Sequence, residues 1–113
     1  YYAYNRMGLS YSQLGDHARA QEKFQSALTL KPNYVEAITN LGYLFYKQKN
    51  YSTAISKFNQ ALKLDVKSIE NYVNLSRAHF EHDQSNESIK ILQKGLKFNP
   101  NNEVLLNNLV EVN

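Results

Sequence analysis

The sequence predicts an all-α protein, a right-handed α-solenoid of antiparallel helix pairs. Three observations predict this fold. Blocks of 34 residues repeat along the chain, at 1–34, 35–68 and 69–102. Within each block, apolar residues recur at helical spacing in two runs that a turn separates. The chain contains only two prolines and four glycines, so few residues interrupt the helices.

The blocks match best at small and bulky positions. The aligned small residues are Gly8, Gly42 and Ser76 at the eighth position, and Ala20, Ala54 and Ser88 at the twentieth. Large side chains there would hold two helices apart, so these small residues predict close packing within each pair. Phe24 and Phe58 are then expected to reach the cleft between neighbouring pairs.

The predicted helices span residues 2–14, 18–30, 35–48, 52–64, 69–82, 86–98 and 103–112. Gly15 followed by Asp16 offers a glycine that ends one helix and a carboxylate that caps the next. Asn50 lies in the corresponding turn of the second block. Pro32 ends the second helix, and Val66 stands at the equivalent position one block later.

The last predicted helix has apolar residues around much of its circumference. They are Val104, Leu105, Leu106, Leu109, Val110 and Val112. We interpret residues 1–113 as one domain, in which segment 103–113 is either a capping helix or the first helix of a fourth repeat. We favour a repeat that is cut short, and the alternative is that the apolar face contacts another chain.

The 34-residue unit resembles the tetratricopeptide repeat family. The residues of the first block that carry the resemblance are Tyr4, Met7, Gly8, Tyr11, Ala20, Phe24, Ala27 and Pro32. The third block departs from the pattern, with Ser76, His79, Ser88, Leu92 and Gly95. The resemblance covers the whole chain. It implies a non-catalytic protein-interaction scaffold, which binds a peptide segment of a partner protein in a concave groove.

The resemblance also implies which positions face the groove, namely the second, fifth, sixth, ninth, twelfth and thirteenth of each block. The residues expected to bind the peptide are Asn5, Arg6, Leu9, Asn40, Tyr43, Tyr46, Lys47, Asn74, Arg77, Phe80 and Asn108. The same positions hold Tyr2, Ser12, Gln13, Glu36, Thr39, Glu70, Val73, Glu81, Val104 and Asn107.

Two features of this set predict how a ligand is held. Asparagine recurs at the sixth position of successive blocks, and a carboxamide both donates to and accepts from a peptide backbone. This is similar to the asparagine ladder of a glycosyltransferase in the family, although the asparagines could instead only solvate the groove. Tyr43, Tyr46 and Phe80 lie near Arg and Lys residues, a combination typical of binding hot spots. It suits an apolar anchor with an acidic neighbour, unless the rings pack on neighbouring helices.

One known subtype of the family does not fit. Chaperone-binding members hold two carboxylates with a clamp of Lys, Asn and Arg, and here only Asn40 matches that pattern. Glu70 stands where a basic residue is needed, and it would repel a C-terminal carboxylate.

Catalytic and cofactor motifs are absent from the sequence, so we expect neither an enzyme activity nor a cofactor. No phosphate-binding glycine loop, dinucleotide fingerprint or H-E-x-x-H motif occurs, and the acidic residues are scattered singly. His79 and His82 lie on adjacent turns, but no third or fourth metal ligand is indicated. We therefore expect His79 to be a half-buried core residue and no metal to bind.

The distribution of charge and of apolar residues limits the classes of partner that we expect. The net charge of +3 is divided as +2, +3 and 0 over the three blocks and −2 over residues 103–113. This is a gradient along the chain and not a basic stripe, so nucleic acid is not expected to bind. No apolar run is long enough to cross a membrane. Two alternatives to a free-standing scaffold are a recruiting region of a larger enzyme, such as a glycosyltransferase, and self-assembly through the apolar last helix.

Overall fold

The computed structural model describes residues 1–112; residue 113, the last of the predicted segment 103–113, lies outside the described residues. The seven helices along this range are α1 (Tyr2–Gln13), α2 (His17–Leu30), α3 (Val35–Lys47), α4 (Tyr51–Leu64), α5 (Ile69–Glu81), α6 (Ser85–Phe98) and α7 (Glu103–Val112). All seven predicted helices are confirmed, with each end within one residue of its predicted position. None of these helices is long and apolar enough to cross a membrane.

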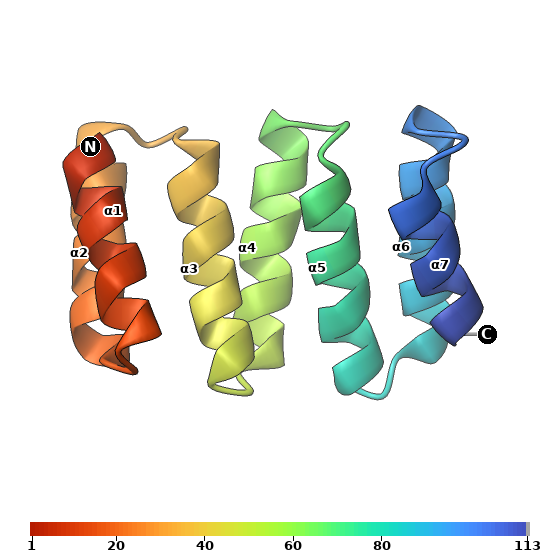
Figure 1. Cartoon of the computed structure of the whole chain (residues 1–113), viewed down its shortest axis with the longest axis horizontal. Coiled ribbons are helices and arrows are strands. Elements are labelled where there is room, and N and C mark those ends of the chain that lie inside the picture. Colours follow the sequence, from red (N-terminus) through yellow and green to blue (C-terminus); the bar gives the residue numbers. More distant parts are fainter. Residues whose placement is uncertain (113) are drawn as a thin grey trace.

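The helices form an α-solenoid of pairs stacked in a row, with extents of 37 × 25 × 20 Å (Figure 1). Within residues 1–112, α1, α3, α5 and α7 each contact the next helix of their own set, whereas α2, α4 and α6 do not contact one another. We call the first set the inner layer and the second the outer layer. A stack in which only one layer is in mutual contact curves toward that layer, so the inner layer forms the concave face.

A left-handed backbone residue ends the first helix of each pair. Gly15 has φ of 79° and is followed by Asp16, whose carboxylate accepts a hydrogen bond from the backbone N–H of Arg19. Both predicted roles are confirmed. In the next two pairs the left-handed residues are Lys49 (φ 63°) and Asp83 (φ 60°). The second turn therefore depends on a lysine in a conformation that favours glycine, next to the predicted Asn50.

Close packing within the first two pairs depends on the absence of a side chain at the eighth position. A Cβ atom on Gly8 would lie 2.5 Å from Cε1 of Phe24, and one on Gly42 would lie 2.8 Å from Cε1 of Phe58. Phe24 also packs in one cluster with Leu41 of α3, which confirms that it reaches the next pair. The predicted small-residue contacts therefore set the distance between paired helices.

In the third pair, two hydrogen-bonded serines occupy the positions where the paired helices approach each other closely. Ser76 on α5 and Ser88 on α6 are both fully buried, and their hydroxyl oxygens lie 2.7 Å apart in a hydrogen bond. One hydroxyl supplies the partner of the other, so neither is left unpaired in the core. Gly95 lets Tyr72 approach, because a Cβ atom there would lie 2.9 Å from Cγ of that ring.

The two ends of the solenoid are less well covered than its middle. Tyr4 and Met7 on α1, and Leu14 at its C-terminal cap, are exposed, although their spacing is that of one apolar stripe on a helix. The reason is that α1 contacts only α2 and α3. On α7, Leu105 is fully buried whereas Val110 is 76% exposed.

Candidate functional site

The concave face contains two hollows, each lined by residues of several helices. The first hollow has a volume of about 360 Å³ and lies across the N-terminal part of the inner layer. Its lining consists of Tyr2, Asn5, Arg6, Leu9, Val35, Glu36, Thr39, Asn40, Asp65, Ser68, Glu70 and Asn71. Four residues predicted to bind the peptide, Asn5, Arg6, Leu9 and Asn40, therefore lie together here.

A chain of hydrogen bonds holds the floor of the first hollow. Asn40 Nδ2 donates to Asn5 Oδ1 over 3.0 Å, and Asn5 Nδ2 lies 3.5 Å from the hydroxyl of Tyr34. That hydroxyl donates in turn to Glu36 Oε2 over 3.0 Å. Burial, followed by the bond to Glu36, raises the pKa of Tyr34, so its phenol keeps its proton and acts as the donor. Asn5 is only 3% exposed, and the chain fixes its orientation.

Asn71 lies beside this chain with part of its carboxamide unpaired. Its Nδ2 lies 2.9 Å from Thr39 Oγ1 and 3.2 Å from Ser68 Oγ, whereas Oδ1 has no hydrogen-bond partner among residues 1–112. Both neighbours are hydroxyls, which either donate or accept, so turning the amide over would leave the nitrogen unpaired instead. Asn71 is 1% exposed, and an unpaired polar atom in a buried side chain is costly unless another group meets it.

The second hollow has a volume of about 310 Å³ and lies between α3, α5 and α7. It is lined by Tyr46, Ser76, Arg77, Phe80, Glu81, Asn108, Glu111 and Val112. Four more predicted residues, Tyr46, Arg77, Phe80 and Asn108, are therefore brought together. Tyr46 and Glu81 lie in the same lining, and burial, followed by the charge of Glu81, raises the pKa of the Tyr46 phenol.

Three predicted residues line neither hollow. Tyr43 is 44% exposed and stacks on Tyr46 with ring centroids 5.9 Å apart, and the Lys47 ammonium lies 5.3 Å from the Tyr43 ring. Tyr43 and Lys47 therefore form a surface continuous with the second hollow. Asn74 is half-buried, and its carboxamide makes no hydrogen bond with residues 1–112.

The three carboxamides of the predicted asparagine ladder differ in their surroundings. The Nδ2 of Asn40 is committed to Asn5, and that of Asn108 donates to the carbonyl of Val104 over 2.7 Å. Of these three asparagines, Asn74 is the one whose carboxamide makes no hydrogen bond within residues 1–112. Equal spacing along the sequence therefore does not give three equivalent binding groups.

Six lining residues do not occupy a predicted groove position, namely Val35, Asp65, Ser68, Asn71, Ser76 and Val112. Asp65 and Ser68 belong to the segment that joins α4 to α5, and Asn71 lies on α5. Asn71 occupies the third position of its block, where the previous block has the buried Ala37. A polar residue at a position that is otherwise apolar was the one signal in the sequence that could have identified it.

The histidines form no metal site in the described residues, where no three His, Cys, Asp or Glu side chains cluster. His79 is half-buried, as expected, and its Nδ1 lies 2.7 Å from Gln84 Oε1 in a hydrogen bond. His82 is exposed, and its ring meets the edge of Tyr51.

The stacked pairs, the concave inner layer and its two hollows define a helical-repeat interaction module. Two family models described as tetratricopeptide repeat match residues 5–68 and residues 45–110, each more than half of the chain. The chain therefore belongs to the tetratricopeptide repeat family, whose domains are in general non-catalytic interaction modules. No curated protein sequence matches it.

Solved structures with the same fold include one domain bound to a peptide. The first TPR of Spaghetti (RPAP3) bound to the HSP90 peptide SRMEEVD is similar over 97% of this chain and 89% of that one, with a TM-score of 0.85 and 22% identity. The first TPR domain of human RPAP3 gives 96% and 86%, a TM-score of 0.84 and 22% identity. The MamA RS-1 ArsTM double mutant gives 97% and 62%, with a TM-score of 0.82 and 25% identity.

Proposed function

We propose that this protein is a non-catalytic scaffold, which holds a peptide segment of a partner protein along its concave face. The observation that carries the proposal is the pair of hollows on the inner layer, each lined by side chains from at least two helices. A groove that spans several repeats suits an extended segment, because successive ligand residues meet successive helices. The fold shared with a domain that binds a peptide supports the same mode.

The exposed aromatic and cationic residues of the second hollow are the proposed anchors. Phe80 is 44% exposed and lines the hollow next to Arg77. Aromatic and Arg side chains are enriched at binding hot spots, and an aromatic ring buries a large area with only two side-chain torsions to restrict. The relative binds the acidic peptide SRMEEVD, whereas Glu70 of this chain would oppose a ligand of that charge.

The test is to select peptides and then remove the anchor. A displayed library of random 12-residue peptides is selected on the whole chain, and the recovered peptides are synthesised for fluorescence polarisation. Phe80→Ala is expected to weaken binding about tenfold or more, which is the usual effect of losing a hot-spot aromatic. Phe98→Ala is the matched control, because Phe98 is also partly exposed but lies on the outer layer. Equal effects of the two substitutions, or no recovered peptides, would contradict the proposal.

Association between copies is the second candidate, favoured by the exposed apolar side chains Val104, Leu106 and Val110 on α7. Light scattering over a range of concentrations tests it directly. A mass of one chain at every concentration would exclude it. A dimer that Val110→Lys returns to a monomer would support it.

A further inference from the structure

Charge is divided between the two layers of the solenoid. The outer layer, α2, α4 and α6, carries seven Lys and Arg against two Glu. The inner layer, α1, α3, α5 and α7, carries three Lys and Arg against five Glu. The overall charge of +3 therefore conceals an outer layer of +5 and an inner layer of −2.

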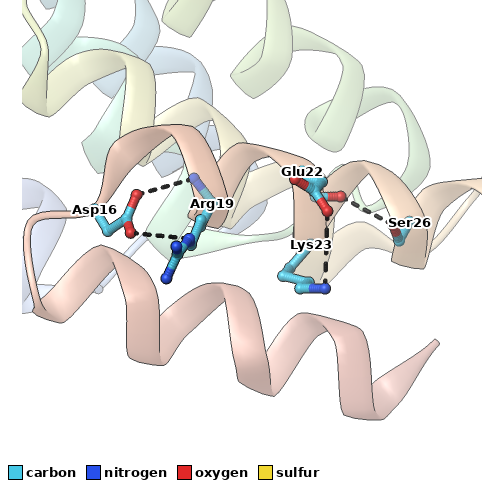
Figure 2. A network of polar contacts seen from close by, with 5 residues as sticks. All are labelled: Asp16, Arg19, Glu22, Lys23 and Ser26. Carbon is cyan, nitrogen blue, oxygen red and sulfur yellow. Dashed lines mark hydrogen bonds and ion pairs between the residues drawn. The ribbon is translucent and has the colours of Figure 1, made fainter.

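The ion pairs follow the same division. The three pairs within residues 1–112 join Asp16 to Arg19 over 3.6 Å, Glu22 to Lys23 over 3.8 Å and Glu87 to Lys90 over 3.4 Å. Every one of them lies on α2, its cap or α6, and Figure 2 shows the two on α2. The carboxylates of the two hollows make no ion pair within the described chain, so a ligand does not have to displace an internal cation to reach them.

The first hollow has an excess of negative charge and an unpaired polar group. Glu36, Asp65 and Glu70 line it, whereas Arg6 is its one cationic lining residue. Asn71, also in the lining, keeps one atom of its buried carboxamide without a partner in the described residues. A ligand that brings a cation matches the excess of carboxylates in this hollow.

The second hollow attracts cations in two ways. Glu81 and Glu111 line it against the single cation Arg77, and the rings of Tyr46 and Phe80 lie in the same lining. An aromatic face attracts a Lys or Arg side chain through its quadrupole, and a nearby carboxylate adds to that attraction.

We infer that the concave groove selects a basic segment of its partner, with one Lys or Arg side chain in each hollow. This inference rests on the proposed function and names the chemistry of its ligand. The sequence pattern instead predicts a ligand with an acidic residue next to its apolar anchor. That prediction rests on Arg6, Lys47 and Arg77 alone and leaves out the carboxylates that the fold places around them.

Charge reversal within the groove tests the inference. Random 12-residue peptides are selected in parallel on the natural chain and on Glu70→Lys/Glu81→Lys, which changes one exposed carboxylate in each hollow. Peptides from the natural chain are expected to be enriched in Lys and Arg, and to lose about tenfold or more in affinity for the variant, as two lost charge contacts imply. Their affinity is also expected to fall severalfold between 50 and 300 mM salt.

The matched control is Glu22→Lys/Glu87→Lys, which makes the same change of net charge on the outer layer. It is expected to leave affinity within about twofold, because its sites lie outside the groove. Equal losses in the two double variants would overturn the inference, since net charge alone would then explain the effect.

The remaining outcomes separate the two proposals. Peptides that require Phe80 but show no basic enrichment and ignore the reversal at Glu70 and Glu81 would overturn the inference while the proposed groove function stands. Peptides whose binding ignores Phe80 as well would overturn both.

Discussion

Asn40 and Asn74 occupy the same position in successive repeats, yet the structure gives them different roles in stability. Asn40 Nδ2 supplies the hydrogen bond to Asn5 Oδ1 over 3.0 Å, and Asn5 is almost fully buried. Asn74 makes no side-chain hydrogen bond within residues 1–112. Replacing each with alanine therefore compares two chemically identical changes in two environments.

The expected difference follows from the cost of an unpaired buried group. Asn40→Ala leaves Asn5 Oδ1 without its donor, which costs about 1–3 kcal/mol of unfolding free energy, toward the lower end where water enters the space. Asn74→Ala removes a half-buried group without stranding a partner, so its cost is about 0.5 kcal/mol or less. In a chain of this size, 1 kcal/mol lowers the melting temperature by roughly 4 °C or more.

Urea unfolding followed by circular dichroism measures both variants, with the m-value checked for constancy. Asn5→Ala combined with Asn40→Ala completes a double-mutant cycle, in which coupling of about 1 kcal/mol is expected. Equal destabilisation by Asn40→Ala and Asn74→Ala, or zero coupling, would refute the reasoning. The expected result would make Asn74 the position to change in a test of ligand binding, because changing Asn40 would also disturb the fold.

Three further predictions concern the fold. Ala54→Leu, at a fully buried contact between α3 and α4, is expected to cost about 1–3 kcal/mol by overpacking, and an unchanged melting temperature would contradict the helix pairing. Lys49→Gly is expected to stabilise the protein by roughly 0.5–1 kcal/mol, because the left-handed conformation at that position suits glycine. Gly15→Ala at the equivalent turn is expected to destabilise it. Changes of the opposite sign in urea unfolding would contradict this account of the two turns. Burial and the charge of Asp65 raise the pKa of Tyr72 above its ordinary value of 10.0. The stability contributed by its protonated phenol is therefore present below pH 10.0 and is lost as the pH rises through the raised pKa. Tyr72→Phe is expected to reduce this alkaline loss of stability in thermal melts at successive pH values.

The sequence predicted which residues line the hollows better than it predicted how their side chains are arranged. Eight of the eleven predicted residues line one of the two hollows, because groove-facing positions recur every 34 residues and the helical period fixes their side of the helix. The sequence could not show that Asn5 is tied to Asn40, since the two residues lie 35 positions apart. Nor could it show that the segment between α4 and α5 brings Asp65 to the first hollow.

The sequence by itself determined the elements of this protein and their pairing. Apolar spacing set the seven helices, and the small residues at Gly42 and Ala54 set the close approach within a pair, because both depend on local geometry. The curvature, the two hollows and the sign of charge around them were decided only by the tertiary structure. Each of these requires side chains from several repeats to meet, and a period of 34 residues specifies a stack without specifying how its polar groups pair across it.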